Sequence, residues 1–204
     1  MTAHSISRRT FLGVAVGALV SQLPAAAWAD GSDDGFPLPP FDYSKLAPQF
    51  RPSVVAYKGR QFPGTVIVDT SARQISLVVD GGLAIRWGCA VGKDGFRWAG
   101  MADVGRKVMW PKWTPPPEMI KRKPELAQWK NGMPGGPANP LGARALYLFR
   151  DGRDTGYRIH GTTEPASIGT AASSGCIRMF NEDVIELYRR TPVGSRVLVY
   201  SEGL

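Results

Sequence analysis

The sequence predicts a single, mostly β domain, and three observations support this fold class. Short β-rich segments follow one another from about residue 63 to about residue 91. One stretch, residues 181–190, has apolar residues at helical spacing. Removing a 29-residue signal from the chain of 204 leaves 175 residues, enough for one domain that buries about 70% of its unfolded surface.

Residues 1–29 have the features of an export signal. Arg8 and Arg9 precede an apolar run from Phe11 to Leu23, and Ala27-Trp28-Ala29 forms a small-residue cleavage site before Asp30. The paired arginines predict a twin-arginine signal, hence export to the periplasm or cell envelope of a bacterium. The apolar run is shorter than the roughly 20 residues that span a bilayer. Cleavage after residue 29 is expected, and retention as an uncleaved anchor is the alternative.

Two segments of the remaining chain are rich in proline. Residues 30–62 form an N-terminal extension that predicts a tether or an irregular strap over the domain at 63–201. Residues 110–142 are dense in proline and glycine and hold Trp110, Trp113 and Trp129, with a helical part expected at 124–130. Such a long irregular stretch is often a lid. The tryptophans either contact substrate or pack the strap onto the sheet.

The net charge limits the classes of molecule that the protein is expected to bind. The signal contains two arginines and no acids, so the mature chain has 23 basic and 17 acidic residues, a net charge of +6. Nucleic acid, an anionic membrane surface and an acidic wall polymer all suit a basic protein. No nucleic-acid motif is present and the longest basic run is Lys121-Arg122-Lys123. A wall polymer is therefore the favoured partner, and a merely solvated basic face is the plainer interpretation.

Two side chains sixteen positions apart, His160 and Cys176, carry the chemistry that the sequence suggests. A thiol with the ordinary pKa of about 8.5 is mostly protonated at neutral pH, so a catalytic cysteine needs help from an imidazole or from backbone dipoles. The other histidine, His4, lies in the signal, which leaves His160 as the imidazole of the mature chain. The plainer interpretation is that both side chains are structural fillers.

The segments around this pair favour catalysis. His160 follows the alternating run 156–159, which predicts the end of a strand. Ser173, Ser174 and Gly175 predict a small flexible turn whose N–H groups can point at one spot, as an oxyanion hole requires. Cys176 is therefore expected on a loop between a strand and a helix.

The helix expected at 181–190 has Asn181 as its capping residue, acids in its first turn and bases in its last. Cys89 lies in an apolar strand and is expected to face the core, since a disulfide to Cys176 would silence the nucleophile. Two cysteines and one histidine without close spacing do not predict a metal site.

Three motifs together resemble the catalytic core of the YkuD-type L,D-transpeptidases: Ile159-His160-Gly161-Thr162, Pro165-Ala166-Ser167-Ile168-Gly169, and Ser173-Ser174-Gly175-Cys176-Ile177-Arg178-Met179. The resemblance extends to paired opening strands at 64–69 and 74–79, to residues 134–142 and to a closing strand at 196–200. It implies a β-sandwich-like domain with one short helix after the nucleophile and a long Pro/Gly/Trp-rich loop over the cleft.

The resemblance also implies the activity and the roles of the motif residues. Cys176 would be the nucleophile and His160 the base in a peptidoglycan L,D-transpeptidase that needs no cofactor. The substrates would be peptidoglycan stem peptides, and the acceptor amine would belong to a second stem peptide or to an anchored envelope protein. Arg178 would hold a substrate carboxylate or shape the site, and its plainer interpretation is a salt bridge to a neighbouring loop.

The chain departs from the family pattern at Ser174, where many members carry a second histidine. A backbone carbonyl or hydroxyl, from Gly161 or Ser173, is therefore expected to orient the base, while Ser174 stays a substrate-binding candidate. Backbone N–H groups at Gly175 and Cys176 are expected to stabilise the oxyanion. Two alternatives remain open: an L,D-carboxypeptidase or hydrolase that resolves the same thioester with water, and a non-catalytic wall-binding module.

Overall fold

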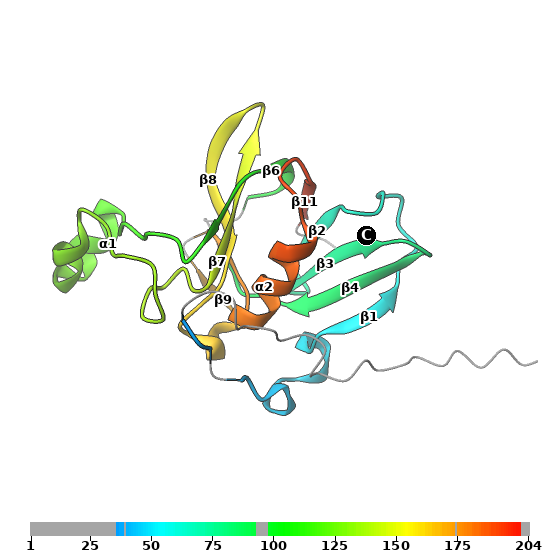
Figure 1. The fold of residues 1–204 in the computed structure, drawn as a ribbon, viewed down its shortest axis with the longest axis horizontal. Helices are drawn as coiled ribbons and strands as arrows, with labels where there is room; N and C mark the ends of the chain where they lie inside the picture. Colours follow the sequence, from blue (N-terminus) through cyan, green and yellow to red (C-terminus); the bar gives the residue numbers. More distant parts are fainter. Residues whose placement is uncertain (1–35, 39, 93–97, 174, 201–204) are drawn as a thin grey trace, which may run out of the picture.

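The computed structural model describes residues 36–38, 40–92, 98–173 and 175–200. The proposed signal, residues 1–29, lies outside these ranges. Nine strands form one mixed sheet in the order β1-β4-β3-β2-β11-β6-β7-β8-β10, and β5 pairs with β9 in a second, two-stranded parallel sheet (Figure 1). The strands are β1 (Ser53–Ala56), β2 (Val66–Asp69), β3 (Gln74–Val79), β4 (Leu83–Gly88), β5 (Val91–Gly92), β6 (Gly100–Met109), β7 (Arg144–Arg150), β8 (Arg153–His160), β9 (Ala171–Ser173), β10 (Ile177–Arg178) and β11 (Arg196–Tyr200).

The helices are few and short. The two α-helices are α1 (Pro117–Arg122) and α2 (Asn181–Arg190), and the 3-10 turns are η2 (Tyr43–Lys45), η3 (Pro48–Phe50), η4 (Pro124–Trp129) and η5 (Pro165–Ser167). The mostly β fold predicted from the sequence is confirmed. Within the described ranges, no helix is long and apolar enough to cross a membrane.

Local sequence explains the strands that carry the site. The β7–β8 hairpin closes through Asp151-Gly152, and both residues have positive φ, 51° and 72°, as a two-residue turn between twisted strands requires. Ile159 near the end of β8 and Ile177 in β10 are both buried in the core. Because successive strand residues face opposite sides, the neighbours of these isoleucines are directed to the other face.

One large core joins the sheet to α2. It contains β-branched residues of β2, aliphatic residues of β7 and the fully buried Trp87 and Cys89, so the expectation that Cys89 faces the core is confirmed. The predicted helix begins and ends where expected and contributes Val184 and Leu187 to this core. The cap was predicted wrongly: Phe180 occupies the N-cap without a side-chain hydrogen bond, and the Asn181 amide bonds elsewhere.

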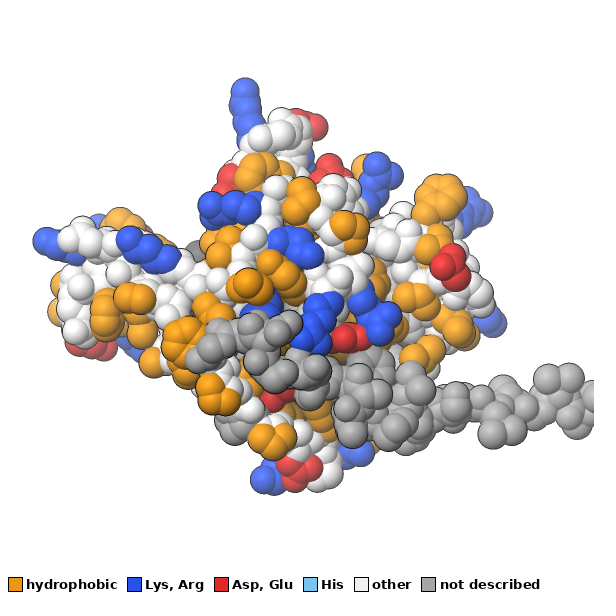
Figure 2. Space-filling model, viewed as in Figure 1, with side chains coloured by type: hydrophobic (Ala, Val, Ile, Leu, Met, Phe, Trp, Pro, Cys, Tyr) orange, Lys and Arg blue, Asp and Glu red, His pale blue; other side chains and the backbone are white. Residues whose placement is uncertain are grey.

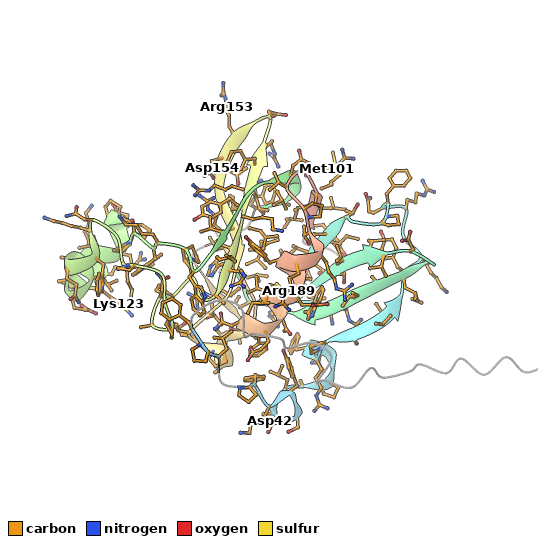
Figure 3. All side chains as sticks on the ribbon, viewed as in Figure 1. Asp42, Met101, Lys123, Arg153, Asp154 and Arg189 are labelled. Carbon is orange, nitrogen blue, oxygen red and sulfur yellow. The ribbon has the colours of Figure 1, made fainter. Side chains whose placement is uncertain are left out.

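The N-terminal strap, residues 36–38 and 40–50, runs beneath α2 (Figure 1). Phe41 packs on Phe180 with ring centroids 4.2 Å apart, and the Tyr43 hydroxyl donates a hydrogen bond to Asp183 Oδ1 at 2.5 Å. Figure 3 shows Asp42 at the outer side of this strap, away from the helix. The extension is not irregular throughout, because β1 pairs with β4 and adds an edge strand to the sheet.

Tyr43→Phe is expected to lower the free energy of unfolding by about 1–3 kcal/mol at neutral pH, because the buried Asp183 loses its hydroxyl donor. Burial raises the pKa of Asp183 well above its usual value, and the Tyr43 bond opposes this rise. A carboxyl with a raised folded pKa loses its stabilising contribution as the pH rises through that pKa. The decrease in the free energy of unfolding caused by Tyr43→Phe should therefore grow with pH.

Urea unfolding at about pH 5 and about pH 8 measures this effect of pH. Tyr57→Phe is the matched control, since the Tyr57 hydroxyl only accepts a long bond from the Gln61 N–H at 3.3 Å. Equal losses in both variants, or a loss in Tyr43→Phe that does not change with pH, would contradict the prediction.

Residues 110–142 form a lobe between β6 and β7. Its tip, α1 with η4, projects from the body and carries Lys123 (Figures 1 and 3). The helical part predicted at 124–130 is the 3-10 helix η4, and the α-helix α1 directly before it was not predicted. At the end of the lobe, Gly142 lies beside Gly161 and Thr162, and Leu141 beside His160.

Trp110 begins the lobe in an unusual backbone conformation. Its φ is 44°, in the left-handed region that residues other than glycine rarely adopt. The Trp110 ring packs edge-on against Phe36 of the strap with centroids 4.9 Å apart. This contact agrees with the plainer interpretation that a tryptophan packs the strap.

Candidate active site

The two motifs predicted to carry the chemistry lie on neighbouring strands. β8 and β10 run parallel at one edge of the large sheet, with Ile159 opposite Ile177 and His160 opposite Arg178. The Met179 N–H also donates to the His160 carbonyl at 2.8 Å. Cys176, one residue before β10, is thus in line with Arg158, and one parallel pairing brings His160 and Cys176, sixteen positions apart in sequence, to adjacent strands.

His160 is buried and its tautomer follows from its partner. Nδ1 lies 2.6 Å from the Gly161 carbonyl oxygen, which can only accept, so Nδ1 carries the proton. The remaining nitrogen, Nε2, is then an acceptor. Burial lowers the pKa of His160 to about 4, the charges of Arg178 and Arg158 add to this, and the carbonyls of Gly161 and Leu141 oppose it. The imidazole is therefore neutral at pH 7 and able to take a proton.

Cys176 is a protonated thiol at neutral pH. Burial raises the pKa of Cys176, whereas a backbone group of Arg158 and the charges of Arg158 and Arg178 lower it. The raised pKa of the thiol and the lowered pKa of His160 together describe two neutral groups rather than a preformed thiolate–imidazolium pair. Such a cysteine is activated when a base removes its proton during attack.

Two arginines flank the pair. Arg178 Nη1 donates to Glu164 Oε2 at 2.7 Å, which is the salt bridge of the plainer interpretation. Glu164 is 69% exposed, so the bridge is weak and open to exchange with another carboxylate. Arg158 was not predicted as a site residue. The available signal was its position two residues before His160 in an alternating strand, which puts both side chains on the same face. Its guanidinium bonds both oxygens of Asp154 and lies 4.1 Å from the Tyr147 ring centroid.

Ser173, three residues before Cys176, lies in more regular structure than expected. Ala171–Ser173 is strand β9, paired with β5, so Ser173 belongs to a strand and not to a flexible turn. Gly175 has φ 123°, a conformation that favours glycine directly before Cys176. Ser174 and the side chain of Ser173 lie outside the described part of the chain. Of the two candidates for orienting the base, Gly161 has a carbonyl in contact with His160.

Positive charge is distributed rather than concentrated. Figure 2 shows Lys and Arg side chains scattered over the visible face and the lobe, with acidic side chains among them. Among the described residues, no three His, Cys, Asp or Glu side chains are placed to bind a metal ion.

The chain was compared with known proteins. Residues 63–199 match the family model described as YkuD, the L,D-transpeptidase catalytic domain. One curated relative, the "Probable L,D-transpeptidase ErfK/SrfK" of Escherichia coli K12, is 40% identical over 106 residues, which are 50% of this chain and 32% of the relative. Across the curated relatives at the head of the comparison, the chain spans about a third to a half of their length.

Two solved structures share the fold. An L,D-transpeptidase from Mycobacterium smegmatis superposes with a TM-score of 0.51 at 19% identity, over 67% of this chain and 58% of that one. A Brucella melitensis chain is 47% identical, with a TM-score of 0.52 over 78% of this chain and 99% of that one. It is described as a probable carnitine operon oxidoreductase, a name that disagrees with the family match. The family match covers more than half of the chain and includes β8, which ends at His160, and Cys176 directly before β10. The chain therefore belongs to the L,D-transpeptidase catalytic domain family.

Proposed function

We propose that the protein is an exported peptidoglycan L,D-transpeptidase in which Cys176 is the nucleophile and His160 the base. One observation supports this more than any other. The parallel pairing of β8 with β10 brings the neutral imidazole and the cysteine loop together, with Nε2 left as an acceptor. Residues 63–201 would form the catalytic domain, residues 30–62 its extension, and residues 1–29 a signal read by the twin-arginine route.

The reaction begins on the donor stem tetrapeptide. His160 Nε2 takes the Cys176 proton as Sγ attacks the carbonyl carbon of the third residue, a diamino acid. The N–H groups of Gly175 and Cys176 stabilise the oxyanion. The C–N bond to the terminal D-alanine breaks, and the imidazolium gives its proton to the leaving amine. The products of this half are a thioester at Cys176 and free D-alanine, and the step needs no cofactor.

The second half transfers the acyl group to an amine. The acceptor amine, from another stem peptide or an anchored envelope protein, loses a proton to His160 as it attacks the thioester, and the thiol is regenerated. Arg178 would bind a carboxylate of the peptide in exchange for Glu164, with Ser174 as a second contact. The weak, exposed Arg178–Glu164 bridge supports this role, because a substrate carboxylate can replace that of Glu164.

Intact-protein mass spectrometry with a purified disaccharide tetrapeptide tests this proposal. The expected result is an acyl-enzyme adduct at Cys176, release of D-alanine and formation of cross-linked dimers. Tripeptides without dimers would instead assign the protein as an L,D-carboxypeptidase. No adduct with the tetrapeptide or with a carbapenem, together with a Cys176 that resists alkylation, would favour a non-catalytic wall-binding module.

A further inference from the structure

The Asn181 side chain joins two segments beside His160. Its Oδ1 accepts the Ala143 N–H at 3.0 Å, and its Nδ2 donates to the Thr162 carbonyl at 3.0 Å. One partner is a donor and the other an acceptor, so the orientation of the amide is set by its surroundings. Asn181 therefore ties the first turn of α2 both to the residue before β7 and to the residue two places after the base.

The turn held in this way contains the carbonyl that orients the base. Gly161 lies between His160 and Thr162, and its carbonyl oxygen is 2.6 Å from His160 Nδ1. On one side, the Gly161 N–H donates to the Arg144 carbonyl at 3.1 Å. On the other side, Asn181 holds the Thr162 carbonyl. The peptide that presents the Gly161 oxygen is thus fixed at both ends.

The packing around Gly161 and Gly142 leaves no room for a side chain at either position. A Cβ atom built on Gly161 would lie 2.1 Å from Asn181 Oδ1, and one built on Gly142 would lie 2.2 Å from the same atom. The amide fills the space that both glycines leave. A residue other than glycine at 161 would push Asn181 away from its partners, or displace the turn itself.

We propose that Asn181 is a positioning residue for the base: it fixes the Gly161 carbonyl and thereby holds His160 in the tautomer with Nδ1 protonated. The inference deepens the proposed function and rests on it for the role of His160 as base. An aspartate at 181 would keep an acceptor for Ala143 but set a carboxylate against the Thr162 carbonyl. A leucine at 181, which is similar in size to asparagine, would lose both hydrogen bonds. Both changes release the turn.

The imidazole itself reports the effect. In the full chain labelled with nitrogen-15, long-range proton–nitrogen correlation spectra at neutral pH distinguish the two ring nitrogens, and the His160 signals are those that vanish in His160→Gln. The wild type should show Nδ1 protonated and Nε2 unprotonated. Asn181→Asp and Asn181→Leu should shift both nitrogens toward a mixture of tautomers. Gly161→Ala, which displaces the amide from the opposite side, should do the same.

The rate of acyl-enzyme formation is a second measurement, and it relates the His160 tautomer to the proposed reaction. The rate at which Cys176 forms its acyl-enzyme should fall about 10- to 100-fold in the Asn181 variants, as expected when a partner behind a functional histidine is removed. Tyr43→Phe is the matched control, because it loses a buried hydrogen bond in the same helical turn without touching residues 160–162. It should lower stability while leaving the tautomer and the acylation rate unchanged.

The outcomes separate the two proposals. Unchanged His160 nitrogen signals in folded Asn181→Leu or Asn181→Asp would overturn the positioning role, and if neither variant folds, unchanged signals in Gly161→Ala would do so. A shift of similar size in Tyr43→Phe would also overturn it, since the effect would then be a general loss of stability. Failure of the wild type to form an acyl-enzyme would instead refute the proposed function, and the tautomer comparison would still decide the role of Asn181.

Discussion

Cys176→Ala is expected to abolish the acyl-enzyme and to lower transfer activity by about 10³-fold or more, as when the nucleophile of a covalent enzyme is removed. The reason is chemical: without Sγ no thioester forms, and the neutral His160 has no thiol proton to accept. Because the Cys176 side chain is only partly buried, this small change should leave the fold intact. Intact mass and product analysis on the disaccharide tetrapeptide measure both losses.

The second cysteine provides the control. Cys89 is fully buried in the core, where burial raises the pKa of its thiol, and it lies between β4 and β5. Cys89→Ala should therefore lose some stability but retain acyl-enzyme formation at Cys176. Transfer that persists in Cys176→Ala, or an adduct that disappears only in Cys89→Ala, would remove Cys176 from the mechanism.

His160→Gln is expected to lower the rate of acyl-enzyme formation by about 10²- to 10⁴-fold, the usual contribution of a general base. The thiol has a raised pKa and the imidazole a lowered one, so we expect a neutral imidazole to remove the thiol proton during attack. The substitution removes that acceptor. Glutamine keeps a polar side chain of similar length against the Gly161 carbonyl, which limits damage to the turn.

The pH dependence gives an independent signature of the same residue. Since the pKa of His160 is lowered to about 4, the wild-type acylation rate should be constant through mildly acidic pH and fall only as the imidazole is protonated near that value. His160→Gln should lack this acid limb. Circular dichroism at each pH excludes unfolding as the cause. An acid limb that survives in His160→Gln, or one centred near pH 6.5, would contradict the assignment.

Secondary-structure elements were predicted well where one continuous segment of sequence contains the whole pattern. The helix at 181–190 was found from its periodicity and its charged ends, and the closing strand at 196–200 from the family resemblance. The pairing of His160 with Cys176 was expected from the motifs and stays a prediction. The parallel alignment of β8 and β10, which supports it, was not predicted, because β10 has two residues and too short a pattern to recognise.

The errors share a cause: long-range contacts overruled local preference. Asn181 resembles a helix cap in sequence, but Ala143 and Thr162, distant along the chain, supply better partners for its amide. Ser173 resembles part of a flexible turn, but pairing of β9 with β5 makes it a strand residue. β1 was not separated from the proline-rich extension, since its four residues become a strand only beside β4.

The parallel ladder between β8 and β10 has a consequence for how this enzyme family can diversify. The spacing of His160 and the cysteine loop is set by backbone hydrogen bonds between two strands, not by the length of the connection between them. Residues gained or lost within 163–166, where the chain is exposed, would change the rim around the site while the ladder stays in register. Changes in this connection can therefore alter the surface around the proposed site while His160 and Cys176 keep their positions on the ladder.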